Sequence, residues 1–300
     1  MAATAQPDNS FAAVIPMPRH VVILDGTTEL SADVRLSTSN VLPFMRKTMR
    51  GVFSNVNIRV VANKKRFVID VTIVEESELD LQGVSNLDDF YQMTIVDNVV
   101  TIESSSQLGA IWGTQTFTAI FAKAGADSVI PNCRIRDWAS VRHRGVWVKA
   151  NWQCASMRLD EWVSVVDRIA AMKLNLFGFS LVGHADERLG RPAADFLLAP
   201  MPGKEPVKAE ISSEWFSPDA GEWKEEEAPP LIFAEGFLPS LIDAARERGV
   251  TLVPSLEPFT VNLLARALDK TLADKPVDLA SPKLREAVEH FIGLIFEKSF

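Results

Sequence analysis

Residues 135–181 constrain the fold of this chain more than any other stretch, because their pattern is that of a strand, a helix and a second strand. Residues 146–149 and 174–181 are rich in the branched and aromatic residues of strands, and residues 159–172 carry apolar side chains at helical spacing. A helical crossover of this kind joins two parallel strands. Parallel α/β sheets bind ligands at the carboxyl ends of their strands, so we expect any functional site there.

The first part of the chain has a different pattern, in which short strands are interrupted by two helices. Asp97-Asn98 is predicted to form a tight hairpin turn, and Asp25-Gly26 is expected to close the first strand. Gly109 and Gly113 let the second helix pack closely on a sheet. We predict a small α+β domain over residues 1–134, an antiparallel or mixed sheet with two helices on one face. Its strands are predicted at 20–24, 34–36, 57–61, 67–74, 91–96 and 99–103, and its helices at 41–53 and 105–123.

After residue 181, strands and helices continue to alternate. Residues 183–230 hold many prolines and charges, which indicates a long insertion rather than a core element. A helix at 237–248, a strand at 250–256 and a helix at 281–296 follow. About three strand–helix units result, whereas a closed (β/α)8 barrel of the TIM type has eight. We therefore predict that residues 135–300 are the N-terminal part of a barrel domain, completed by a longer chain or by something else.

Composition narrows the possible partners. The chain has 300 residues, 47% of them hydrophobic, and a net charge of −8, which argues against nucleic acid and against an anionic membrane surface. The N-terminus lacks the pattern of a signal peptide, so a cytoplasmic protein is the default expectation. Cys133 and Cys154 are expected to be free thiols. The acidic residues 75–89 are expected to be a solvated connection rather than a metal site, and no cofactor is predicted.

Five segments resemble, in order and spacing, the family 20 glycoside hydrolases, which are β-N-acetylhexosaminidases. They are IPMPRHVVILDG, YQMTIVDNVVTIESSSQLGAIWGTQTF, IRDWASVRHRGVWV, DRIAAMKLNLFGFSL and AARERGVTLVPSLE. The resemblance implies a small α/β domain followed by a (β/α) barrel, and a carbohydrate substrate with a terminal amino sugar. It also implies substrate-assisted catalysis, in which the acetamido oxygen of the sugar attacks the anomeric carbon. The Asp-Glu pair that this mechanism needs follows the fourth barrel strand in the family, so we expect it beyond residue 300.

The family's substrate-binding motifs are altered in this sequence. Where the family has an Asp and then an Arg-His pair after the first barrel strand, this chain has Lys149 and then Trp152-Gln153. The His-Trp-His segment of the second strand is replaced by Gly178-Phe179-Ser180. After the third strand, only Glu257 keeps the acidic character expected there. These exchanges suggest a hydrolase with another sugar specificity, or a non-catalytic carbohydrate-binding or scaffold homologue, as alternatives to a hexosaminidase.

Three residues are candidate substrate contacts. Trp152 follows the first barrel strand and could stack on a sugar ring or belong to the core. Glu257 follows the third strand and could accept a sugar hydroxyl, or cap the next helix or pair with Arg266. His184 has acidic neighbours, but no metal-ligand spacing, and is expected to contact substrate if it is functional. Trp147, by strand alternation, is expected in the core.

Overall fold

The computed structural model describes residues 11, 14–62, 66–148, 157–180, 182–184, 195–197, 212–217, 220–227 and 236–255, together with residues 280, 282, 285 and 289. The chain forms two compact units. The first consists of Met1–Arg144, Ala170–Asn175 and Glu247–Gly249, and the second of the remaining residues.

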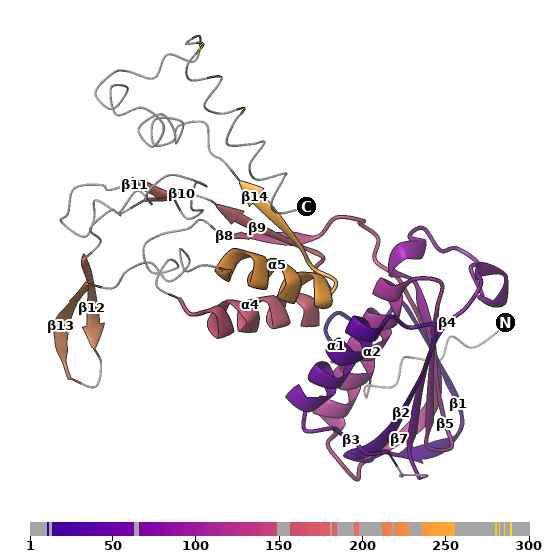
Figure 1. The fold of residues 1–300 in the computed structure, drawn as a ribbon. Coiled ribbons are helices and arrows are strands. Elements are labelled where there is room, and N and C mark those ends of the chain that lie inside the picture. Colours follow the sequence, from indigo (N-terminus) through magenta and orange to yellow (C-terminus); the bar gives the residue numbers. More distant parts are fainter. Residues whose placement is uncertain are drawn as a thin grey trace, which may run out of the picture. The chain divides into compact units, whose positions relative to one another are not determined.

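The first unit contains a seven-stranded mixed sheet with helices α1 and α2 on one face (Figure 1). The strand order is β1-β7-β5-β6-β4-β2-β3, with antiparallel pairs from β1 to β6 and parallel pairs from β6 to β3. This arrangement confirms the predicted mixed sheet with two helices on one face. The strands are β1 His20–Glu29, β2 Asp33–Ser39, β3 Arg59–Val60, β4 Val68–Ile73, β5 Tyr91–Val96, β6 Val99–Ser104 and β7 Val129–Asp137. The helices are α1 Pro43–Asn55 and α2 Gln107–Ala124, with short 3-10 turns η1 Glu76–Glu78 and η2 Leu87–Asp89.

Helix α2 lies very close to the sheet because of its two glycines. A Cβ atom at Gly109 would lie 2.1 Å from the carbonyl oxygen of Phe90, and one at Gly113 would lie 2.5 Å from Cγ2 of Ile102. The close approach predicted for these glycines is therefore confirmed. The hairpin turn is confirmed as well, since Asp97 and Asn98 have φ values of 49° and 64°, as a type I′ turn requires.

Two features of the sheet differ from the prediction. Strand β1 does not end at Asp25-Gly26 but continues to Glu29, through a register irregularity between Ile23 and Thr27. Gly26, with φ of 87°, absorbs this irregularity. Strand β7 was not among the predicted strands, and it extends past residue 134 to Asp137.

The second unit contains a three-stranded parallel sheet of order β14-β9-β8, with β8 Gly145–Val148, β9 Leu176–Ser180 and β14 Thr251–Ser255. Helix α4 Leu159–Ala171 connects β8 to β9, so the predicted strand–helix–strand unit is confirmed. Helix α5 Phe237–Glu247 precedes β14. Two antiparallel pairs lie within the predicted insertion: β10 Val182–His184 with β11 Asp195–Leu197, and β12 Ser212–Ser217 with β13 Glu222–Glu227. The predicted helix at 281–296 lies largely outside the described residues.

Candidate functional site

The carboxyl edge of the three-stranded sheet is the first candidate site. The parallel register aligns Val148, Ser180 and Ser255 toward the same edge of the sheet. The segments that leave this edge carry the residues singled out from the sequence. His184 ends β10, where its backbone pairs with Asp195. Trp152 and Glu257 lie outside the described residues, so their convergence with His184 stays a prediction.

One face of this sheet carries helix α4, and the other carries Trp147. The rings of Phe177 and Trp162 of α4 lie 5.8 Å apart between centroids, so the row containing Phe177 faces the helix. Trp147 pairs with Gly178 in the next row and therefore lies on the opposite face. Its side chain is 55% exposed, which corrects the expectation that it belongs to the core. Strand alternation alone cannot tell which face is covered.

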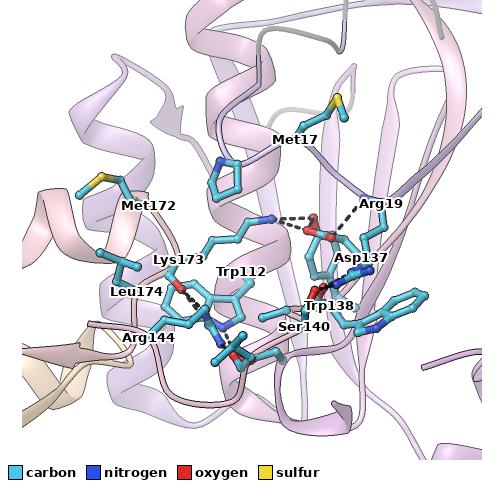
Figure 2. Close-up of a pocket in the computed structure, with 15 residues that line it drawn as sticks. Met17, Arg19, Trp112, Asp137, Trp138, Ser140, Arg144, Met172, Lys173 and Leu174 are labelled. Carbon is cyan, nitrogen blue, oxygen red and sulfur yellow. Dashed lines mark hydrogen bonds and ion pairs between the residues drawn. The ribbon is translucent and has the colours of Figure 1, made fainter. Parts of the chain in front are cut away.

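A cavity of about 630 Å³ in the first unit is the second candidate site (Figure 2). Its size is typical of small-molecule sites. Apolar side chains from several segments form much of its wall, including Pro16, Met17, Trp112, Trp138 and Met172. The same wall contains a set of buried charged side chains, which Figure 2 shows converging from different segments.

Lys173, Asp137 and Tyr91 form the first part of this charged set. Nζ of Lys173 lies 2.6 Å from Oδ2 of Asp137 and donates to the hydroxyl oxygen of Tyr91 at 3.1 Å. The Tyr91 hydroxyl also lies 2.6 Å from Oγ1 of Thr116 and donates to Asp137 at 3.1 Å. Burial lowers the pKa of Lys173, and the charge of Asp137 partly opposes this effect. Burial and the Asp137 charge both raise the pKa of Tyr91.

Arg144 and Asp89 form the second part. The guanidinium of Arg144 donates to Oδ2 of Asp89 at 2.7 Å, and also to the carbonyl oxygen of Lys173 at 2.7 Å. Trp112 Nε1 donates to Oδ1 of Asp89 at 2.7 Å. Asp89 is 2% exposed, which shows that the acidic segment 75–89 is not solvated at this end. Sequence reasoning missed this carboxylate because its partners Arg144 and Trp112 are distant in the chain.

These contacts define what the charged set does. Each carboxylate is bound by a cation and by a second donor within the protein. The set joins the residue that precedes β8 and the turn that precedes β9 to the seven-stranded sheet, all within the first unit. Its role is therefore to hold Arg144 and Lys173 against the seven-stranded sheet within the first unit.

Among the residues that the structure describes, no group of three His, Cys, Asp or Glu side chains could hold a metal ion. No helix in the described part of the chain is long and apolar enough to cross a membrane.

Comparison with known proteins shows which proteins this fold resembles. Residues 12–138 match the family model described as glycosyl hydrolase family 20, domain 2. This range contains the whole seven-stranded sheet and both of its helices. Residues 12–138 are thus similar to this glycosyl hydrolase domain, and the resemblance to family 20 is confirmed. A search among curated proteins found no match.

Solved structures of family 20 enzymes share the fold. The N-acetyl-β-hexosaminidase of Streptomyces plicatus in complex with Thio-NAglucal has a TM-score of 0.66 at 14% identity, over 97% of this chain and 57% of that one. The β-N-acetylhexosaminidase of Streptomyces coelicolor A3(2) has a TM-score of 0.66 at 14% identity, over 97% of this chain and 58% of that enzyme. The exo-β-N-acetylglucosaminidase of Vibrio harveyi in complex with N-acetylglucosamine has a TM-score of 0.61 at 16% identity, over 94% of this chain and 44% of that enzyme. The chain therefore spans about half the length of these enzymes.

Proposed function

We propose that this chain is the N-terminal part of a glycoside hydrolase that removes terminal N-acetylhexosamines. The observation that carries this proposal is the family 20 domain over residues 12–138, followed directly by a parallel strand–helix–strand unit. A parallel sheet that follows this domain is the expected start of the catalytic barrel. The carboxyl edge of β8, β9 and β14 is then the substrate site.

Catalysis in this proposal is substrate-assisted. The acetamido oxygen of the sugar attacks the anomeric carbon, while one carboxylate polarises the amide and a carboxylic acid protonates the leaving oxygen. The two carboxyl groups would form an Asp-Glu pair after a fourth barrel strand, which we place beyond Phe300. Trp152, His184 and Glu257 would contact the sugar from the segments that follow the first three strands.

The coding sequence after Phe300 tests where the catalytic pair lies. The proposal predicts a fourth apolar strand ending in an adjacent Asp and Glu, followed by further strand–helix units. A stop codon directly after Phe300 would contradict it, because the proton donor would then be missing.

A second candidate function is carbohydrate binding without hydrolysis. It is favoured by the end of β9, where Gly178 stands in the segment in which family members have His-Trp-His, and where the indole of Trp147 fills the space of a side chain. An assay of the longest natural chain on an aryl N-acetyl-β-glucosaminide separates the two candidates. Turnover supports the hydrolase, whereas saturable sugar binding without turnover supports the binding protein.

A further inference from the structure

We propose that the cavity of the first unit binds a small carboxylic acid with an apolar body, and that the guanidinium of Arg19 pairs with its carboxylate. The residues that line the cavity all belong to the first unit. The inference therefore rests neither on the parallel sheet of the second unit nor on the proposed hydrolysis of amino sugars.

The wall of the cavity carries an excess of positive charge. It contains three cations, Arg19, Arg144 and Lys173, and two carboxylates, Asp89 and Asp137. Arg144 pairs with Asp89 and Lys173 pairs with Asp137, so both carboxylates have a cation and Arg19 remains over. The local excess is opposite in sign to the net charge of −8 of the whole chain, and it favours an anionic ligand.

Neutral groups hold the guanidinium of Arg19 in place. Its Nε donates to the carbonyl oxygen of Trp138 at 2.7 Å, and its Nη2 donates to the hydroxyl oxygen of Ser140. Its Cζ lies 5.1 Å from the centroid of the Trp138 ring, close enough for attraction between the cation and the ring. Within the described part of the chain, no carboxylate pairs with this side chain. A guanidinium fixed in this way can bind a carboxylate through two parallel hydrogen bonds.

The apolar part of the wall fits the body of such a ligand. Met17 lies two residues before Arg19 and Met172 lies directly before Lys173, so the chain places a methionine near two of the cations. Figure 2 shows Arg19 and Met172 on opposite sides of the cavity. Methionine side chains are flexible and adapt to ligands of different shape. A volume of about 630 Å³ is ample for an arylacetic acid. An inorganic anion would leave this apolar surface without a partner.

A purely structural role for Arg19 is the competing explanation. Its contacts with Trp138 and Ser140 attach the residue before β1 to the segment that follows β7. That role needs the hydrogen bonds and the ring contact, but it gives no reason for a positive charge in excess beside an apolar cavity. It predicts that loss of Arg19 changes stability and that no carboxylate binds.

The test measures binding of 4-fluorophenylacetate to the longest natural chain by ¹⁹F NMR titration. The wild-type protein should bind it saturably, and Arg19→Gln should weaken binding at least about tenfold, because a charge-assisted pair is lost. The alcohol 2-(4-fluorophenyl)ethanol, which has the same ring and no charge, should bind at least about tenfold more weakly than the acid and should not distinguish wild type from Arg19→Gln.

Two further variants keep the test decisive. Met17→Glu places a negative charge on the cavity wall and should weaken binding of the acid, and Met17 is 63% exposed, so the exchange should leave the fold intact. Arg35→Gln is the matched control, because Arg35 is an exposed arginine of β2 that does not line the cavity and should leave affinity unchanged. Urea unfolding of each variant verifies that it is folded.

Three results would overturn the inference. They are no saturable binding of the acid by the wild-type chain, equal affinity for the acid and the alcohol, and unchanged affinity in both Arg19→Gln and Met17→Glu. None of them bears on the proposed hydrolase, whose assay uses a different ligand.

Discussion

Nζ of Lys173 lies 2.6 Å from Oδ2 of Asp137, and both side chains are about nine-tenths buried. Asp137 is the last residue of β7, and Lys173 follows helix α4 in the turn that leads to β9. Lys173 has φ of 54°, so its backbone takes the left-handed conformation that ends the helix. The pair thus links the end of β7 to the turn that follows helix α4, within the first unit.

Replacing Lys173 with Met should destabilise the protein strongly. The variant leaves the Asp137 carboxylate buried without its cation, and removing one partner of a buried ion pair costs about 3–5 kcal/mol. Urea unfolding followed by circular dichroism measures the change. Lys47→Met is the control, because Lys47 is 76% exposed in its ion pair with Glu247 and should change stability by less than about 1 kcal/mol. Equal effects of the two variants would contradict the role given to Lys173.

Asp89→Ala should also be severely destabilising, by about 3 kcal/mol or more, because the buried guanidinium of Arg144 loses its carboxylate partner and the indole N–H of Trp112 loses its acceptor. Its neighbour Asp88 provides the comparison. Asp88 pairs with Arg142 at the surface, where both side chains are more than half exposed, so Asp88→Ala should cost less than about 1 kcal/mol. If thermal unfolding shows similar losses for both variants, the Asp89 contacts do not carry the stability assigned to them.

Two glycine-to-alanine changes in helices should have opposite signs. Gly109→Ala should destabilise, since its methyl carbon would lie 2.1 Å from the carbonyl oxygen of Phe90 and force α2 away from the sheet. Gly51→Ala in α1 meets no atom within 4 Å and should stabilise by about 0.5–1 kcal/mol through helix propensity. Chemical denaturation of both variants checks this. Stabilisation by both changes would show that α2 does not need the close approach.

Stability should fall at alkaline pH because of Cys133. This side chain is fully buried in β7, and burial raises the pKa of its thiol from 9.0 to about 12. Between these values the unfolded chain loses the proton and the folded chain keeps it. The free energy of unfolding should therefore decrease as pH rises from 9 to 12, by up to about 1.4 kcal/mol per pH unit from this group. Below pH 8 the contribution should be constant.

Cys133→Ala isolates this effect, because other groups, including Tyr91, titrate alike in both proteins. The difference in unfolding free energy between wild type and variant should shrink steadily above pH 9. A pH-independent difference would mean that the thiol is not shielded from water in the folded state.

The sequence predicted the architecture wherever the determining interactions are local. The strand–helix–strand unit follows from apolar spacing within residues 146–181, and the Asp97-Asn98 turn follows from two adjacent residues that tolerate positive φ. The close packing of α2 was predictable from Gly109 and Gly113, because glycine spacing along one helix face is itself a local pattern.

Features set by distant partners were not predictable in this way. Strand β7 contains Pro131, Arg134 and Arg136, which obscure its alternation, and its strand conformation depends on pairing with β1 and β5. Asp89 has the sequence context of a surface residue and becomes buried only because Arg144 and Trp112 reach it. The candidate sugar contacts Trp152 and Glu257 lie outside the described residues and stay predictions.

The relative rates at which the longest natural chain hydrolyses two aryl substrates test the central claim most directly. The substrates are an aryl N-acetyl-β-glucosaminide and the matching aryl β-glucoside, which lacks the acetamido group. A hydrolase in which the acetamido oxygen attacks the anomeric carbon must cleave the first with retained configuration and the second at least a thousandfold more slowly, because the second carries no internal nucleophile. Equal cleavage of both substrates, or no cleavage of the N-acetyl substrate, would contradict the account.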